Sequence, residues 1–294
     1  MMKEYSQKLA LILFKLLRAI LLFIPEKVKI IIGKFIGIIL MLLSKSRKNV
    51  TSNNISNSNL KLNNKKLIQI VKESYQNLGI TLVELLTIDK YEFNSDKSKI
   101  TFKNFDLIIQ AKSRGNGVIL LSGHYGNWEL LAYSASKLLN ETLNIVVKYQ
   151  MNPFTDKYLR NLRQRGGNKL LDMKKAGIQL VKILKSNGIV AMLADQRAGK
   201  NEGIELDFMG NLARAYKAPA VLALKFNTPI VIGFAVRNRT GNYEVELVEL
   251  IHDDLDNNED GIRELTKRYL DLLEKAIIQN PGHWAWQHNR WKLD

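Results

Sequence analysis

Short apolar runs alternate with stretches of helical periodicity over residues 117–279, and this alternation constrains the fold more than any other feature. Runs rich in Val, Ile and Leu and bounded by turn residues are typical of short buried strands. The predicted strands are 117–122, 144–148, 168–172, 189–194, 229–236 and 243–249. The predicted helices are 128–139, 154–165, 174–187, 214–227 and 260–279. Strands separated by helical segments favour pairing through crossover helices. The sequence therefore predicts an α/β fold with a mixed, mostly parallel sheet flanked by helices.

Two apolar stretches precede this region, "KLALILFKLLRAILLFIP" at 8–25 and "IIIGKFIGIILMLL" at 30–43. Lys8, Lys15 and Arg18 fall on one side of the first helix, which Pro25 should end. Neither stretch offers the roughly 18 charge-free residues of a transmembrane span, and no cleavage site of an export signal follows. A basic stripe beside a broad apolar face is typical of a helix lying in a membrane interface, with a pair of core helices as the alternative.

The chain is therefore expected to divide into membrane-associating helices at 1–45 and an α/β domain at 46–294. Within the second part, the polar stretch 51–64 is predicted to be a connector and 65–88 a helix. A chain of 294 residues suits one large domain with an appendage.

The formal net charge of +16 indicates an anionic partner, such as nucleic acid, anionic lipid, a phosphorylated substrate or an acidic protein. The charge is uneven: residues 148–200 hold twelve Lys or Arg against three Asp, and residues 1–50 hold ten against two Glu. A nucleic-acid coat would be spread more widely or interleaved with aromatic residues. The chain has no cysteine, which excludes disulfides, thiolate metal ligands and a cysteine nucleophile.

The segment "SGHYGNWELL" at 122–131 places His124 directly after a predicted strand and Glu129 early in the next predicted helix. Five residues along one helix would separate the two side chains by about 140°, so they can meet only if His124 lies on the turn before the helix. Glu129 could then accept the imidazole N–H and leave the other nitrogen as a general base. The alternative is a histidine that caps the helix and a surface glutamate. No nucleophilic serine elbow, phosphate loop or zinc helix motif is present.

The other histidines are expected to be structural. His252 is predicted to lie in a solvated loop. His283 and His288 belong to the Trp-rich segment "PGHWAWQHNRWK" at 281–292, which favours packing or a membrane-interface belt. A direct substrate contact through His288 or Arg290 is the alternative.

"SGHYGNWELL" together with "PGHWAWQHNRW" resembles the bacterial lipid A late acyltransferases, which belong to the lysophospholipid acyltransferase superfamily. The likeness covers nearly the whole chain and includes a basic cluster after the apolar segment. Further matching segments, in order, are "NLGITLVELL", "HYGNWE", "NPFTDKYLRNLRQRGGNKLLD", "LADQRAG" and "DFMG". One difference is "YQM" at 149–151, where the family often has "YRP", and it bears on the identity of the donor or acceptor.

The resemblance implies a glycerol-3-phosphate acyltransferase-like fold with an N-terminal apolar membrane anchor. It also implies transfer of an acyl chain from an acyl-carrier-protein thioester, or from acyl-CoA, to a hydroxyl of a lipid A precursor or related glycolipid. His124 would be the base and Glu129 would orient it, while Arg163, Asp195, Asn127 and Arg165 would bind substrate or shape the site. A backbone N–H of the 123–128 turn is a candidate to stabilise the oxyanion.

For location and partners, the resemblance implies the cytoplasmic side of the bacterial inner membrane, acyl carrier protein, the membrane surface and no nucleic acid. No metal or redox cofactor is expected. The basic segment 148–200 would meet the phosphates of the lipid or the acidic face of the carrier protein. Alternatives are a lysophospholipid acceptor, a hydrolase that uses the same two residues, and a basic membrane-surface binding protein without catalysis.

Overall fold

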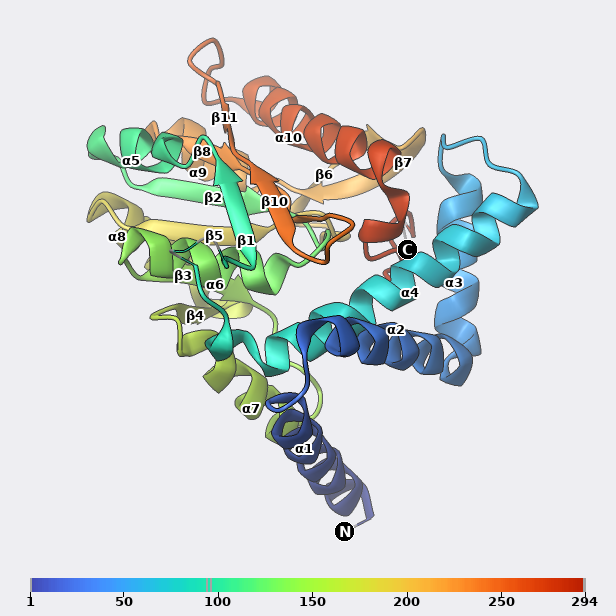
Figure 1. Ribbon diagram of the computed structural model, residues 1–294. Coiled ribbons are helices and arrows are strands. Elements are labelled where there is room, and N and C mark those ends of the chain that lie inside the picture. The colour runs from blue at the N-terminus through green and yellow to red at the C-terminus, as the bar shows by residue number, and fades with distance from the viewer. Residues whose placement is uncertain (1, 94, 96, 293–294) are drawn as a thin grey trace.

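The computed structural model describes residues 2–93, 95 and 97–292, and its centre is a six-stranded sheet in the order β11-β8-β2-β5-β3-β4. Neighbouring strands are parallel except β11, which runs antiparallel to β8. The strands are β2 (Val118–Ser122), β3 (Leu143–Val147), β4 (Lys169–Asp172), β5 (Ile189–Leu193), β8 (Ile230–Ile232) and β11 (Val248–Leu250). The predicted mixed, mostly parallel sheet is confirmed, and helices lie on both of its faces (Figure 1).

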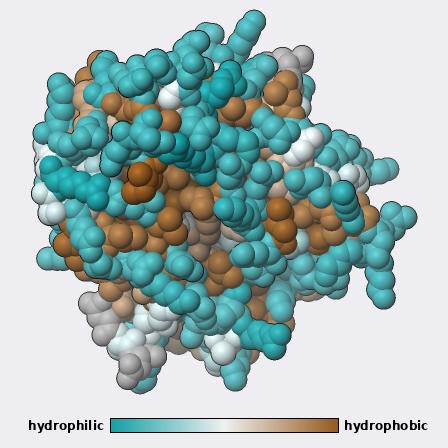
Figure 2. Space-filling view, turned by 90° about the horizontal axis from the view of Figure 1, so that it is seen from above, coloured by the Kyte–Doolittle hydropathy of each residue, from teal (hydrophilic) through white to brown (hydrophobic). Residues whose placement is uncertain are grey.

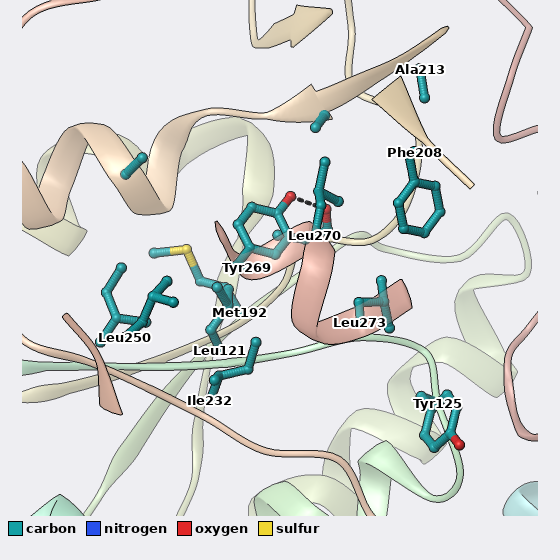
Figure 3. Packing of buried hydrophobic residues seen from close by; sticks show 14 of the residues in the cluster. Leu121, Tyr125, Met192, Phe208, Ala213, Ile232, Leu250, Tyr269, Leu270 and Leu273 are labelled. Carbon is teal, nitrogen blue, oxygen red and sulfur yellow. Dashed lines mark hydrogen bonds between the residues drawn. The ribbon is translucent and has the colours of Figure 1, made fainter. Parts of the chain in front are cut away.

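Alternate residues of β2 face opposite sides of the sheet and bury into two different clusters. Ile119 and Leu121 pack with α8, α9 and α10, whereas Val118 packs with α5 and α6. The bounds of these helices are α5 (Asp106–Ser113), α6 (Trp128–Leu139), α8 (Ala176–Lys185), α9 (Ala218–Phe226) and α10 (Glu259–Gln279). In Figure 3, Tyr269 of α10 lies over the sheet, and its hydroxyl donates to the carbonyl of Ala194 over 2.8 Å. Burial on both faces explains why these strands are continuous apolar runs.

Two smaller sheets flank the central one. β1 (Ile100–Lys103), β10 (Tyr243–Glu246) and β9 (Val236–Arg237) form the first, and β6 (Gly203–Phe208) and β7 (Asn211–Tyr216) form a hairpin. The predicted strands 229–236 and 243–249 are therefore each divided between two sheets. The predicted helix at 214–227 begins only at Ala218, because residues up to Tyr216 pair with β6.

Four helices precede the sheets, and α1 lies along α7 while α2 lies along α4 (Figure 1). The bounds of these four are α1 (Met2–Leu21), α2 (Glu26–Leu43), α3 (Lys45–Asn57) and α4 (Asn64–Leu86), and α7, between β3 and β4, is Pro153–Gln164. The two predicted N-terminal helices are present, and Pro25 separates them as the N-cap of α2.

The connector predicted at 51–64 is wrong over residues 51–57, which belong to α3. This helix is polar along its length, and contacts with the C-terminal segment hold it. Ile55 is buried, and the Asn54 amide donates to the carbonyls of Trp286 over 2.8 Å and His288 over 2.6 Å. Tertiary contacts therefore override the turn-forming composition that the sequence shows.

Glycines allow α2 and α4 to approach closely. A Cβ atom built on Gly37 would lie 2.1 Å from the carbonyl oxygen of Tyr75, and one built on Gly79 would lie 2.1 Å from that of Gly33. Any larger residue at these positions must push the helices apart. The apolar helix α2 is thereby packed tightly against α4, whose other residues support the candidate active site described below.

None of the helices within the described residues is both long enough and apolar enough to cross a bilayer. Large apolar side chains are nevertheless exposed along α1, α2 and the turn between them, including Leu13, Phe23, Phe35 and Leu43. The predicted basic stripe of α1 is incomplete, because Arg18 is turned inward and pairs with Asp89. On the face shown in Figure 2, hydrophobic side chains also gather around a central hollow, with hydrophilic side chains about them.

Candidate active site

His124 lies on the turn between β2 and α6, at the carboxyl end of the sheet. Asp195 lies two residues beyond the end of β5, which is the parallel neighbour of β2. The carboxyl ends of adjacent parallel strands meet at one edge of a sheet, where α/β proteins commonly bind ligands. The topology thus brings together two residues that are 71 positions apart in the sequence.

Asp195 holds the imidazole of His124. One carboxylate oxygen lies 2.8 Å from Nδ1 of His124, and the other accepts from the backbone N–H of His124 at 2.9 Å and from the indole N–H of Trp284 at 2.8 Å. An ionised carboxylate can only accept, so Nδ1 carries the hydrogen, and in the neutral imidazole Nε2 keeps its lone pair. Asp195 therefore fixes the tautomer that a general base requires.

The electrostatics of this pair reinforce the geometry. Burial acts to raise the pKa of Asp195, but the charge and hydrogen bonds of His124, together with Trp284, lower it to about 2. Burial acts to lower the pKa of His124, but the charge and hydrogen bond of Asp195, with the charge of Glu129, raise it above its ordinary value. Asp195 is consequently ionised at neutral pH, and His124 is a stronger base than a free histidine.

Glu129 has a different partner from the one expected. Its two oxygens accept from Nε and Nη2 of Arg163 over 2.7 and 2.6 Å. The prediction that Glu129 accepts the imidazole N–H is therefore wrong, because Asp195 occupies that position. Burial acts to raise the pKa of Glu129, but the charge and hydrogen bonds of Arg163 lower it, so Glu129 stays charged and acts on His124 through its field.

The turn that carries His124 is held by α4. The carbonyl of Gly126 accepts from the amide of Asn77 over 2.9 Å and from the hydroxyl of Thr81 over 3.1 Å. Gly126 has φ of +59°, and a Cβ atom there would lie 1.6 Å from the carbonyl oxygen of Ala235. Only glycine fits this position, and the resulting turn aims His124 back over the edge of the sheet.

Asn127 and Arg165, both expected to bind substrate or shape the site, make contacts within the protein. Asn127 is the N-cap of α6: its side-chain oxygen accepts from the backbone N–H of Leu130, and its amide donates to Glu84 over 2.7 Å. Arg165 pairs with Asp89, which also binds Arg18 of α1. These contacts hold α6 and α7 in place, and a role in substrate binding stays a prediction for both residues.

Ion pairs and hydrogen bonds occupy the arginines of the basic segment 148–200. Arg160 pairs with Asp156 of its own helix, and Arg197 donates to the carbonyl of Lys292 over 2.9 Å. The exposed cations of the segment are Arg165 and eight lysines: Lys148, Lys157, Lys169, Lys174, Lys175, Lys182, Lys185 and Lys200. An anionic partner of this segment would therefore meet mainly lysines.

The Trp-rich segment packs into the core beside the site. Trp284 and Trp286 are buried, and with Phe208 and Trp291 they form an aromatic cluster. Arg290 is also buried, with its guanidinium over the ring of Phe208 and donating to a backbone carbonyl. The packing interpretation of the tryptophans is confirmed.

His288 and His252 both make contacts within the protein, and only His252 differs in exposure from what was expected. Nε2 of His288 accepts from the backbone N–H of Arg197 over 3.0 Å, and burial lowers its pKa to about 4. His252, expected in a solvated loop, is instead buried with Nδ1 3.0 Å from the carbonyl of Leu250. The Nε2 lone pair of His288 is therefore already engaged, so His288 is not placed as a second base.

A cleft of about 370 Å³ opens beside His124. Its lining is partly apolar and partly polar: Leu40, Tyr75, Leu78, Trp128 and Ala285, with Ser44, Arg47, Gln196, Gln287 and His288. A larger groove of about 780 Å³ lies along the opposite side of α4 and does not include His124. Among the described residues, no group of three or more His, Asp or Glu side chains is placed to hold a metal ion.

Sequence reasoning found His124 but assigned its hydrogen-bond partner wrongly. Asp195 was expected to shape the site, yet only the adjacency of β2 and β5 shows that it contacts the imidazole. Trp284 and Gln196 were missed as neighbours of the histidine. Their one signal was position, since both lie in segments that resemble family motifs.

Nearly the whole chain is similar to a known protein family. A search of the curated proteins finds no match. The family model described as "Bacterial lipid A biosynthesis acyltransferase" matches residues 4–293. This match includes the turn with His124, the segment with Asp195 and the Trp-rich segment. The chain therefore belongs to the bacterial lipid A biosynthesis acyltransferase family.

Proposed function

We propose that this protein is a membrane-associated O-acyltransferase that moves a fatty acyl chain from an acyl-carrier-protein thioester to a hydroxyl of a lipid A precursor. The observation that carries the proposal is the lone pair of His124 Nε2, which faces a partly apolar cleft while Asp195 holds Nδ1. Membership of the family supplies the reaction class.

The acceptor hydroxyl would donate its proton to His124 Nε2 as its oxygen attacks the thioester carbonyl. A new C–O bond forms, and the carbonyl oxygen takes up negative charge. Collapse of this intermediate breaks the C–S bond, and the protonated His124 returns the proton to the leaving sulfur. Asp195 stabilises the imidazolium in between, with the charge of Glu129 assisting.

The apolar side chains exposed on α1 and α2 support a membrane location. Phe23 is 89% exposed between the two helices, and Leu43 is 79% exposed at the end of α2. Leu40 and Ser44, from the same end of α2, line the cleft beside His124. We infer that these helices lie in the interface of the inner membrane, on the cytoplasmic side, with the cleft open towards the acceptor lipid.

The test uses purified protein in detergent, acyl-carrier-protein thioesters of several chain lengths and a tetra-acylated lipid A precursor. A gain of one acyl group by mass spectrometry, absent in His124→Ala, is the expected result. Free fatty acid without acylated lipid would identify a thioesterase instead. Absence of any His124-dependent reaction would overturn the proposal.

Two variations of the substrates complete the experiment. Acyl-CoA in place of the carrier protein determines which donor the enzyme accepts. A lysophospholipid in place of the lipid A precursor tests the alternative acceptor class, and preferential acylation of it would replace the proposed acceptor.

A further inference from the structure

The proposed reaction places negative charge on the thioester oxygen, and a hydrogen-bond donor must stand where that charge develops. The backbone turn around His124 is the first place to look. The N–H of His124 donates to Asp195, that of Tyr125 to the carbonyl of Gly123, and that of Gly126 to the carbonyl of His283. The N–H of Asn127 lies 3.4 Å from the carbonyl of Ala235. These four groups are thus directed into the protein and away from the cleft.

Six other residues that line the cleft carry N–H or O–H donors: Ser44, Arg47, Tyr75, Trp128, Gln287 and His288. Nε2 of His288 is an acceptor for the backbone of Arg197. The amide of Gln287 donates to the hydroxyl of Ser74 over 3.0 Å, and the guanidinium of Arg47 donates to the carbonyl of Gln287 over 3.2 Å. The bonds of Gln287 and Arg47 hold the C-terminal segment against α4 and α3, and that of His288 holds it against the segment that carries Arg197.

Gln196 differs from them in position and in partner. It follows Asp195 directly, lines the cleft, and carries its amide nitrogen 3.5 Å from Nε2 of His124. Since Nε2 has a lone pair and no hydrogen, the amide is the donor in this long contact. The amide therefore stands on the same side of the imidazole as the reacting hydroxyl would.

We propose that Gln196 is a catalytic residue whose side-chain amide donates to the oxyanion of the acyl-transfer intermediate. The inference rests on the proposed function. In the intermediate, the attacking oxygen and the oxyanion are bonded to one carbon, so they lie closer together than Nε2 of His124 and the amide nitrogen of Gln196 do. Nε2 can then take the proton of the attacking oxygen while the amide of Gln196 donates to the oxyanion. When the hydroxyl arrives at Nε2, the amide exchanges its weak contact with the imidazole for a charge-assisted one.

Gln196→Ala tests this role through kcat and its pH profile. Loss of one oxyanion donor is expected to lower kcat by about 10²- to 10³-fold with little change in KM. The loss should persist at every pH, because Asp195 and Glu129 still set the pKa of His124. If Gln196 only oriented the neutral imidazole, its removal would cost activity mainly at low pH and the rate would recover at high pH.

Gln196→Glu keeps the size of the side chain and replaces the donor with a negative charge. It is expected to lower kcat at least as much as Gln196→Ala and to move the acidic limb of the profile to higher pH. Gln179→Ala, on the exposed face of α8, is the matched control and should retain wild-type kcat and thermal stability.

The outcomes separate the two proposals. Wild-type kcat in Gln196→Ala, with activity lost in His124→Ala, would refute the role of Gln196 and leave the proposed function intact. An inactive wild-type enzyme with every thioester and acceptor would refute the proposed function, and the oxyanion role with it.

Discussion

Two carboxylates act on His124, one by contact and the other through its electric field. Asp195 touches the imidazole and fixes which nitrogen carries the hydrogen. Glu129 is bound to Arg163, and its charge contributes to the raised pKa of His124 without a hydrogen bond to it. Because the two side chains act differently on the same group, substitution of Asp195 should mainly change the kinetics and substitution of Glu129 the stability.

Asp195→Asn removes the charge that raises the pKa of His124 and can present an amide N–H to Nδ1. The wrong tautomer would then place the hydrogen on Nε2, and kcat should fall by about 10²- to 10⁴-fold. In the wild type, activity is lost as the pH falls through the raised pKa of His124, and in Asp195→Asn this limb should move to lower pH. The pH dependence of kcat/KM measures both effects, and an unchanged limb would show that Asp195 does not set the pKa.

Glu129→Gln leaves Arg163 without its ionic partner in a largely buried site. We expect a loss of roughly 1–3 kcal/mol in the free energy of unfolding, between the values for exposed and buried ion pairs. Arg163→Gln in the same chain should recover part of this loss. Urea unfolding of the two single variants and the double variant measures the coupling, and strictly additive losses would refute the pairing.

At the level of elements, α4 connects the apolar helix α2 to the turn that carries His124. Gly79 of α4 allows α2 to approach closely, and Asn77 and Thr81 on the same helix donate to the carbonyl of Gly126. A displacement of α4 should therefore shift the turn that carries His124.

Gly37→Ala places a methyl group where the carbonyl of Tyr75 already lies. The resulting separation of α2 and α4 should cost about 1–3 kcal/mol of stability and lower kcat as well. Gly177→Ala, in α8, is the control, since nothing lies within 4 Å of its built Cβ and alanine favours helices by up to about 1 kcal/mol. In thermal unfolding, the melting temperature should fall for Gly37→Ala and rise for Gly177→Ala. Equal melting temperatures would argue against a tight interface between α2 and α4.

The elements that the sequence predicts well are those whose local signal agrees with their tertiary position. The apolar run at 117–122 forms the buried strand β2, as its composition predicts. The bounds of the helix predicted at 128–139 are those of α6. Residues 51–57 were wrongly predicted to be a connector, because the helix that they form depends on contacts with Trp286 and His288, far along the chain. The contact between Asp195 and His124 was likewise hidden, since it depends on the order of strands in the sheet and not on spacing.

At the scale of the whole molecule, exposed large apolar side chains gather at the N-terminal helices. The double variant Phe23→Glu and Leu43→Glu should weaken binding to vesicles of anionic phospholipid by about tenfold or more per residue, from lost apolar burial alone. Ile109→Glu, a change at a site on α5 that is 59% exposed, should bind as the wild type does. Co-sedimentation with the vesicles measures both, and equal binding of the double variant would refute a membrane role for these helices.

The Trp-rich segment has a consequence for the timing of synthesis. Trp284 donates to the carboxylate that holds His124, and the carbonyl of His283 accepts from the backbone N–H of Gly126 in the turn that carries His124. A chain still emerging from the ribosome has already released α1 and α2, yet it lacks these last contacts. If α1 and α2 bind lipid as proposed, the growing polypeptide reaches the lipid surface before it is able to act as an enzyme, and the proposed chemistry begins only when the segment around Trp284 has folded into place.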